Sequence, residues 1–169
     1  TTLAQQGLEV SRFQFEFLKG GGRRPPAPFG RLQEEMRQIY RGWLASPPHF
    51  LGGKSLGGRV ALSLAHELPA EGLILLGYPF HPPGKLKKTR LQGFASLRLR
   101  TLILQGDKDP FGRPAEVLSY DLPDCVEIHW LAGADHDFRA TQRYPETWSQ
   151  VASRVDRWMA NKDSASKNT

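Results

Sequence analysis

The chain has 169 residues, of which 39% are hydrophobic and 24% are charged, and its formal net charge is +6. This length suits one domain with a sizeable core and excludes two, so we expect a single domain over 1–160 and a polar, disordered tail over 161–169. No apolar stretch is long enough to span a membrane and no signal peptide precedes the domain, so a cytoplasmic protein without a membrane partner is expected.

The first third of the chain is expected to contain two helices and a strand. Residues 1–6 have the pattern of a helix end, and Gly7 suits the stop of that helix. Apolar and polar residues alternate over 8–17, which predicts a strand with one buried face. A glycine- and proline-rich loop over 20–26 leads to an amphipathic helix over 30–45.

The rest of the chain alternates between strands and helices. Strands are predicted over 49–52, 73–76, 101–104 and 126–131, and helices over 60–65 and 145–159. This alternation predicts the α/β fold class, with a mostly parallel sheet and helices on both faces. In such sheets the functional site lies at the carboxyl ends of the strands.

Cysteine and charge narrow the classes of partner. The single cysteine, Cys125, excludes an intramolecular disulfide and a multi-cysteine metal site, and it suits a reducing compartment. Basic residues gather at Arg23, Arg24 and over 85–100, without a recognition helix, an aromatic RNA-binding motif or zinc-ligand spacing. Solvation explains these charges better than nucleic-acid binding or an anionic substrate does. We therefore expect no nucleic-acid partner, and we also expect no metal and no cofactor.

Ser55 lies in the motif Gly53-Lys54-Ser55-Leu56-Gly57, after a predicted strand and before a predicted helix. A sharp strand-to-helix turn lifts a serine hydroxyl out of a sheet, where it can attack a carbonyl carbon. The turn strains the serine backbone and requires small residues two positions before and two after. Because a chain rich in glycine produces such a motif by chance about one time in ten, the argument depends on its context.

That context is a pair of loops after two later strands. The strand at 101–104 leads into Asp107 and Asp109, and the strand at 126–131 leads into His136. Serine, acid and histidine follow in the chain order of an α/β-hydrolase, with His136 as the base and the acid orienting its ring. Asp109 is favoured as the acid because Pro110 stiffens its turn, although Asp107 stays an alternative.

The other histidines are poorer candidates for the base. His66 falls within a helix, His129 within a strand and His49 at the start of a strand, whereas His81 follows the 73–76 strand and can border the pocket. A phosphate-binding loop ending in Gly53-Lys54-Ser55 is excluded, because the required glycine is replaced by Pro48, which has no N–H.

Four linked motifs resemble one group of α/β-hydrolases. They are Gly52-Gly53-Lys54-Ser55-Leu56-Gly57-Gly58-Arg59, Tyr78-Pro79-Phe80-His81-Pro82-Pro83-Gly84-Lys85, Gln105-Gly106-Asp107-Lys108-Asp109-Pro110-Phe111-Gly112 and Gly133-Ala134-Asp135-His136. The group contains predicted bacterial hydrolases, a testis-expressed eukaryotic protein and the hydrolase-like domain of a histone-acetyltransferase-complex subunit (NSL subunit 3). More distantly it is similar to dienelactone hydrolases, whose nucleophile is cysteine. The resemblance implies Ser55 as nucleophile, Asp109 as acid and His136 as base.

The resemblance also indicates a departure at the amino terminus. Members of this fold begin with a further strand and a His-Gly-Ala-Gly type loop, which supplies half of the oxyanion hole. The present sequence starts after that point, so we expect an incomplete version that lacks one strand and retains the Leu56 N–H as oxyanion donor. Loss of one such donor typically costs on the order of a hundredfold in rate.

These observations lead to a serine hydrolase that cleaves a small-molecule carboxylic ester or similar acyl bond. One alternative is a binding or scaffold module that uses the fold without turnover, which an intact set of Ser55, Asp109 and His136 disfavours. A serine peptidase would use the same side chains. Substrate identity and oligomeric state have no signature in the sequence.

Overall fold

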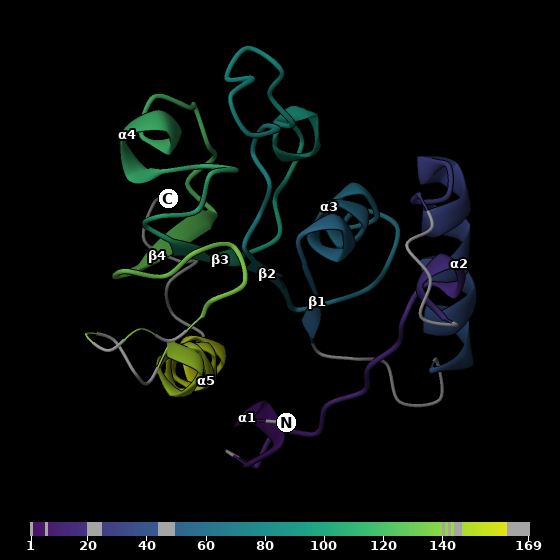
Figure 1. Ribbon diagram of the computed structural model, residues 1–169. Coiled ribbons are helices and arrows are strands. Elements are labelled where there is room, and N and C mark those ends of the chain that lie inside the picture. Colours follow the sequence, from purple (N-terminus) through teal and green to yellow (C-terminus); the bar gives the residue numbers. More distant parts are fainter. Residues whose placement is uncertain are drawn as a thin grey trace.

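A four-stranded parallel sheet forms the centre of the computed structural model, which describes residues 2–5, 7–19, 25–43, 50–139, 141, 143 and 147–161. The strands are β1 (Phe50–Lys54), β2 (Gly72–Leu76), β3 (Thr101–Gly106) and β4 (Val126–Leu131), and they lie in the order β1-β2-β3-β4 (Figure 1). All three pairings are parallel, with Leu51 opposite Leu73, Leu73 opposite Thr101, and Thr101 opposite Val126. The predicted α/β fold class is therefore confirmed.

Helices cover both faces of this sheet. The α-helices are α1 (Thr2–Gln5), α2 (Phe29–Gly42), α3 (Leu56–Ser63), α4 (Pro114–Val117) and α5 (Thr147–Ala160), with 3₁₀ turns η1 (Glu16–Leu18) and η2 (Gln92–Phe94). Figure 1 shows α3 and α5 on opposite sides of the strands, with α2 outside α3. No helix among the described residues combines the length and apolar character that a membrane span requires.

The strands divide the core because successive side chains point to opposite faces. Leu73, Leu75 and Ile103 pack with α2 and α3, whereas Leu102 and Leu104 pack with Val151, Val155 and Trp158 of α5. The continuous apolar runs seen in the sequence are thus strands that are buried on both faces. All six residues of β3 are buried.

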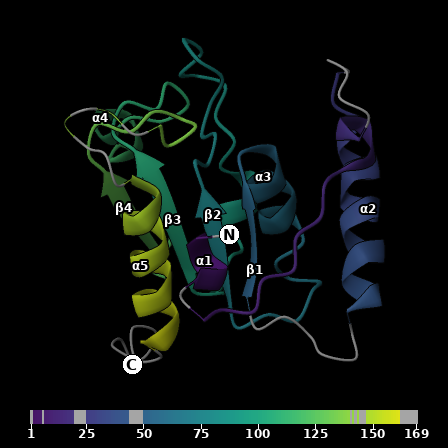
Figure 2. The same cartoon turned by 60° about the horizontal axis from the view of Figure 1, so that its bottom comes forward.

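The segment 8–17 is not the strand that its alternation predicts. It pairs with no described strand and ends in η1, and Figure 2 shows it leading from α1 toward α2. Its alternate phenylalanines contact one another, with ring centroids 5.2 Å apart for Phe13 and Phe15, and Phe13 also contacts Trp43 at the end of α2. The alternation therefore reflects packing against a helix, which offers no free backbone groups for strand pairing.

The remaining boundaries differ modestly from the predictions. The helix expected over 30–45 spans Phe29–Gly42, and the helix expected over 60–65 begins already at Leu56 and ends at Ser63. The strand expected from residue 49 begins at Phe50, and the closing helix spans Thr147–Ala160. Of the loop predicted over 20–26 and the tail predicted over 161–169, residues 20–24 and 162–169 lie outside the described residues. Gly7 follows α1 with a φ of 82°, as predicted for a helix stop.

Candidate active site

Three loops meet at the carboxyl edge of the sheet. β1 ends at Lys54 and is followed by Ser55, β3 ends at Gly106 shortly before Asp109, and β4 ends at Leu131 shortly before His136. Since all strands are parallel, the three loops leave the same edge.

Ser55 occupies a strained turn between β1 and α3. Its φ of 51° and ψ of −113° lie outside the regions that side chains favour, and only Phe138 shares a positive φ among the described non-glycine residues. Such backbone costs roughly 1–3 kcal/mol. The Ser55 N–H donates to Leu76 O (2.9 Å), so the turn is fastened to the end of β2. The strain predicted from the motif is therefore present.

The small residues that the turn needs are Gly53 and Gly58. A Cβ at Gly53 would lie 2.4 Å from the carbonyl carbon of Gly57, and a Cβ at Gly58 would lie 2.9 Å from the Gly53 oxygen. A Cβ at Gly57 would meet nothing within 4 Å. The expectation that position 57 must be small is wrong. The peptide that joins Gly57 to Gly58 approaches Gly53, but only at position 58 would a Cβ meet the strand.

His136 connects the serine to a carboxylate. Its Nε2 lies 2.8 Å from Ser55 Oγ, and its Nδ1 lies 2.8 Å from Asp109 Oδ2. Asp109 is fully buried, and a carboxylate can only accept, so Nδ1 carries the proton that it donates and Nε2 accepts from the Ser55 hydroxyl. The Phe111 ring packs against the imidazole, with centroids 4.4 Å apart.

Asp109, not Asp107, is the carboxylate beside His136. Asp109 Oδ1 accepts from the Phe111 N–H (2.8 Å), and Oδ2 accepts from Gln105 Nε2 (2.8 Å) as well as from His136. Asp107 Oδ1 instead accepts from the Gly133 N–H (2.8 Å) in the following loop. The two carboxylates are two positions apart in the chain, but Asp109 contacts the His136 ring and Asp107 contacts the backbone of Gly133.

The acid loop and the histidine loop are held together by backbone contacts. The Lys108 N–H donates to Ala134 O (3.0 Å), and the Asp107 N–H donates to Leu131 O (3.1 Å). A Cβ at Gly106 would lie 2.3 Å from Ala134 O, so only glycine permits this approach. Together with the Asp107–Gly133 bond, these contacts fix the position of His136 relative to Asp109.

An ion pair joins the serine turn to the histidine loop. Lys54 Nζ lies 2.9 Å from Asp137 Oδ1, and this hydrogen bond holds the pKa of the Asp137 carboxyl below its ordinary value. Neither Lys54 nor Asp137 was singled out from the sequence. Lys54 directly precedes Ser55, and Asp137 directly follows His136. Their positions next to the candidate serine and histidine are the signal that could have identified them.

Leu56 is the first residue of α3, where a backbone N–H lacks an intrahelical acceptor. Such an N–H, at the amino end of a helix and next to Ser55, can receive a negatively charged oxygen.

The other described histidines do not contact Ser55. His81 is fully buried and hydrogen-bonded to Pro82 O (3.0 Å) and Glu116 Oε2 (3.2 Å). His66 is exposed, and burial lowers the pKa of His129 within β4. His49 lies outside the described residues.

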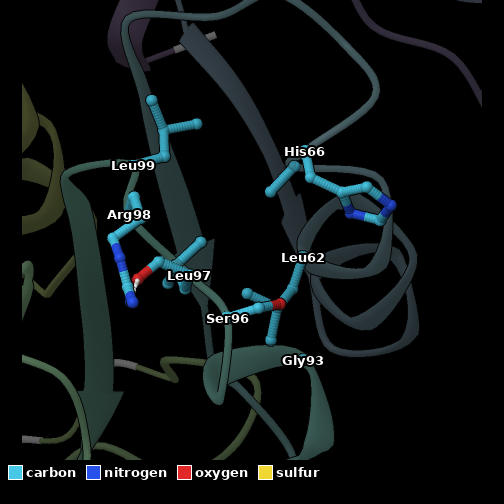
Figure 3. A pocket seen from close by; sticks show the side chains of 8 residues that line it. Leu62, His66, Gly93, Ser96, Leu97, Arg98 and Leu99 are labelled. Atoms are coloured by element: carbon cyan, nitrogen blue, oxygen red, sulfur yellow. Dashed lines mark hydrogen bonds between the residues drawn. The ribbon is translucent and has the colours of Figure 1, made fainter.

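A pocket of about 350 Å³ lies elsewhere, between the end of α3 and the segment 93–99 (Figure 3). Its lining residues are Leu62, Ala65, His66, Gly93, Ser96, Leu97, Arg98 and Leu99. Ser55, Asp109 and His136 are absent from this lining, so the pocket is separate from the candidate site. Among the described residues, no cluster of three or more histidine, cysteine or acidic side chains could hold a metal ion.

A parallel sheet with helices on both faces, and a serine on a strained strand-to-helix turn at its carboxyl edge, define an α/β-hydrolase fold. The chain belongs to the family described as alpha/beta hydrolase domain, which matches residues 1–162.

Solved structures share this fold at low sequence identity. An α/β serine hydrolase without a lid from Xanthomonas campestris is 21% identical, with a TM-score of 0.61, 84% of this chain and 64% of that chain covered. The esterase domain of a Rhodothermus marinus protein is 17% identical (TM-score 0.57, 75% and 67% covered). An α/β serine hydrolase homologue from Coxiella burnetii is 22% identical (TM-score 0.53, 81% and 65% covered). The chain thus spans about two thirds of the length of each.

Proposed function

We propose that this chain is a serine hydrolase that cleaves a carboxylic ester or similar acyl bond through an acyl-enzyme. One observation carries the proposal: the His136 ring is hydrogen-bonded at 2.8 Å to Ser55 on one side and at 2.8 Å to Asp109 on the other. A buried carboxylate that orients an imidazole, which in turn accepts from a serine hydroxyl, is the arrangement that activates serine.

The proposed reaction begins when Ser55 Oγ attacks the substrate carbonyl carbon and its proton moves to His136 Nε2. The electron pair of the carbonyl π bond moves onto oxygen, and the Leu56 N–H donates to the resulting oxyanion. Collapse of this intermediate breaks the bond to the alcohol, which leaves with the proton from Nε2. Water then repeats the sequence on the acyl-enzyme, so the acid is released and the Ser55 hydroxyl is restored.

We also propose a finer placement among the predicted hydrolases related to the testis-expressed protein and the NSL subunit 3 domain, more distantly to dienelactone hydrolases. The motifs around Ser55, His81, Asp109 and His136 support it. Dienelactone hydrolases use a cysteine nucleophile, so their substrate is not transferred to this chain. Burial raises the pKa of the Cys125 thiol, which makes it a poor nucleophile.

The proposed substrate is a small acyl compound and the proposed setting is the cytoplasm, without nucleic-acid or membrane partners. Lys85, Lys87 and Lys88 are exposed, which supports the reading of this basic stretch as a solvated loop. The esterase name of the Rhodothermus marinus neighbour makes esters the first substrates to try.

A fluorophosphonate probe tests the proposal, because it phosphonylates a serine only when that serine is activated. We expect labelling of the wild type and none of Ser55→Ala. Ser63→Ala is a matched control on the same helix, since Ser63 Oγ donates to Val60 O and takes no part in the site. A folded wild type that stays unlabelled would instead favour the non-catalytic binding module. If the wild type is labelled, rates of hydrolysis measured on parallel panels of acyl esters and peptides distinguish an esterase from a peptidase.

A further inference from the structure

Gln105 lies on β3 one residue before the strand ends, and its side chain is fully buried beside Asp109. Its Nε2 donates to Asp109 Oδ2 (2.8 Å) and also faces Gly112 O (3.3 Å). Gln105 therefore contacts the carboxylate from the strand side, whereas His136 contacts it from the loop after β4.

The orientation of this amide is fixed by its neighbours. A carboxylate oxygen and a backbone carbonyl both accept, so only the NH₂ group of Gln105 can face them. The opposite end, Oε1, is buried and has no hydrogen-bond partner in the described part of the chain. An orphaned buried carbonyl is unfavourable. The hydrogen bonds of this side chain therefore all lie on the side of Asp109 and Gly112.

One oxygen atom serves two donors. Asp109 Oδ2 accepts from Gln105 Nε2 and from His136 Nδ1, each at 2.8 Å, whereas Oδ1 accepts from the Phe111 N–H. A hydrogen bond to a carboxylate stabilises its negative charge and leaves less of that charge for a second donor. Gln105 and His136 thus compete for the charge on Oδ2.

We propose that Gln105 is a positioning residue, which fixes the Asp109 carboxylate and moderates how strongly it stabilises the protonated imidazole of His136. This inference rests on the proposed function of Ser55, Asp109 and His136. Gln105 acts through Asp109 and does not touch the reacting atoms. Its effect on His136 passes through the oxygen that the two side chains share, Asp109 Oδ2.

Among the described residues, a carboxylate adjoins His136 in the chain on either side. Asp135 precedes it, and its Oδ1 accepts from the N–H groups of Asp137 (2.9 Å) and Arg139 (3.1 Å). Asp137 follows His136 in the chain and forms the ion pair with Lys54 at 2.9 Å, and Arg139 lies 3.4 Å from the second Asp137 oxygen. These charges lie on the serine turn and the histidine loop. They are unchanged by a substitution on β3, so a shift caused by Gln105 can be assigned to Asp109.

The test is the second-order rate constant of fluorophosphonate labelling as a function of pH, for the wild type and Gln105→Met. Methionine retains the length of the side chain and removes the donor. We expect labelling at neutral pH to slow roughly tenfold. We also expect the pH of half-maximal labelling to rise by about half a unit, because the undivided charge on Oδ2 favours the imidazolium form.

Thr101→Val is the matched control, since it removes the hydrogen bond that the buried Thr101 donates from Oγ1 to Leu99 O, at the other end of β3. It leaves the half-maximal pH unchanged. A Gln105→Met protein that labels with the wild-type midpoint, slowed or not, would overturn the inference, because a merely structural role lowers the rate without moving the midpoint.

A second measurement needs no variant. The side-chain amide proton resonances of Gln105 in the wild type should titrate with the same midpoint as those of the His136 ring, since protonation of His136 draws charge away from the shared oxygen. Gln105 resonances that stay constant through the His136 titration count against the inference. If the wild type is not labelled at all, the proposed function fails, and this titration alone decides whether Gln105 and His136 are coupled.

Discussion

Asp107 and Asp109 illustrate at the residue scale how two identical side chains acquire different roles. Asp109 is fully buried and receives hydrogen bonds from His136, Gln105 and the Phe111 N–H. Asp107 is partly exposed and fastens the loop after β4 through Gly133. The first lies beside His136, and the second joins the loop after β3 to the loop after β4.

This difference predicts opposite profiles for two variants. Asp109→Asn should slow fluorophosphonate labelling by roughly a thousandfold or more, because an amide cannot orient and stabilise the imidazolium. Asp107→Ala should retain most of the labelling rate and lose about 1–3 kcal/mol of unfolding free energy with its bond to Gly133. Labelling rates and urea denaturation measure both. A stable but unreactive Asp107→Ala protein would reverse the assignment of the two residues.

Tyr78 predicts a pH dependence of stability. Burial raises its pKa to about 12 against the opposing effect of Arg59 and Arg90, and its hydroxyl donates to Arg90 O (2.8 Å). The phenol ionises near pH 10 in the unfolded chain, so the stabilisation is complete below pH 10 and is lost as the pH rises toward 12. The loss is about 2–3 kcal/mol.

Tyr78→Phe isolates this effect because phenylalanine cannot ionise. At neutral pH the variant should be about 1 kcal/mol less stable, through loss of one hydrogen bond. Between pH 10 and 12 its stability should approach and then exceed that of the wild type. Denaturant midpoints across this range provide the measurement, and a constant difference between the two proteins would show that the Tyr78 environment is misassigned.

At the scale of elements, the strand-turn-helix around Ser55 depends on one close approach. Gly53 and Gly58 face each other with no room for a Cβ, whereas Gly57 faces open space. The motif in the sequence identifies the turn and the crowded Gly53 correctly, but it places the second crowded position at Gly57 and not at Gly58. The spacing of a motif carries no information on the angle at which the helix leaves the turn.

Two alanine variants test the close contact between strand and helix at Gly53 and Gly58. Gly53→Ala places its Cβ 2.4 Å from backbone, so we expect a misfolded turn and no labelling. Gly57→Ala meets nothing within 4 Å and removes a glycine from a helix, so we expect a gain of about 0.5–1 kcal/mol. Thermal denaturation compares the two. A destabilised Gly57→Ala protein would mean that a side chain at position 57 does not face open space, which would contradict this assignment.

The accuracy of the sequence predictions also varies by element. The continuous apolar runs of β2 and β3 were identifiable because a strand buried on both faces needs them. The alternation over 8–17 was misleading, since Phe13 and Phe15 alternate in the same way whether they face a sheet or, as here, one another and α2. Side-chain periodicity reports burial, and it does not report hydrogen-bond partners.

Over the whole molecule, the sequence indicated the parallel sheet and the three loops at one edge, because chain order and strand positions determine them. It did not indicate Gln105, whose contact with Asp109 depends on the path of the loop between them. It also did not indicate the Lys54–Asp137 pair, which joins residues 83 positions apart. Contacts of this kind depend on the packing of the entire sheet, which no local pattern encodes.

The separation of the site residues along the chain has a kinetic consequence. Ser55 and His136 are 81 positions apart. Ser55 follows β1 and His136 follows β4, and β2 and β3 lie between these two strands both in the sheet and in the sequence. Pairings of parallel strands are distant in sequence and form slowly. After dilution from denaturant, the fluorescence of Trp130 in β4 and Trp158 in α5 should recover before the protein reacts with a fluorophosphonate. The appearance of fluorophosphonate reactivity would then report the last step of folding, in which Ser55 and His136 come together.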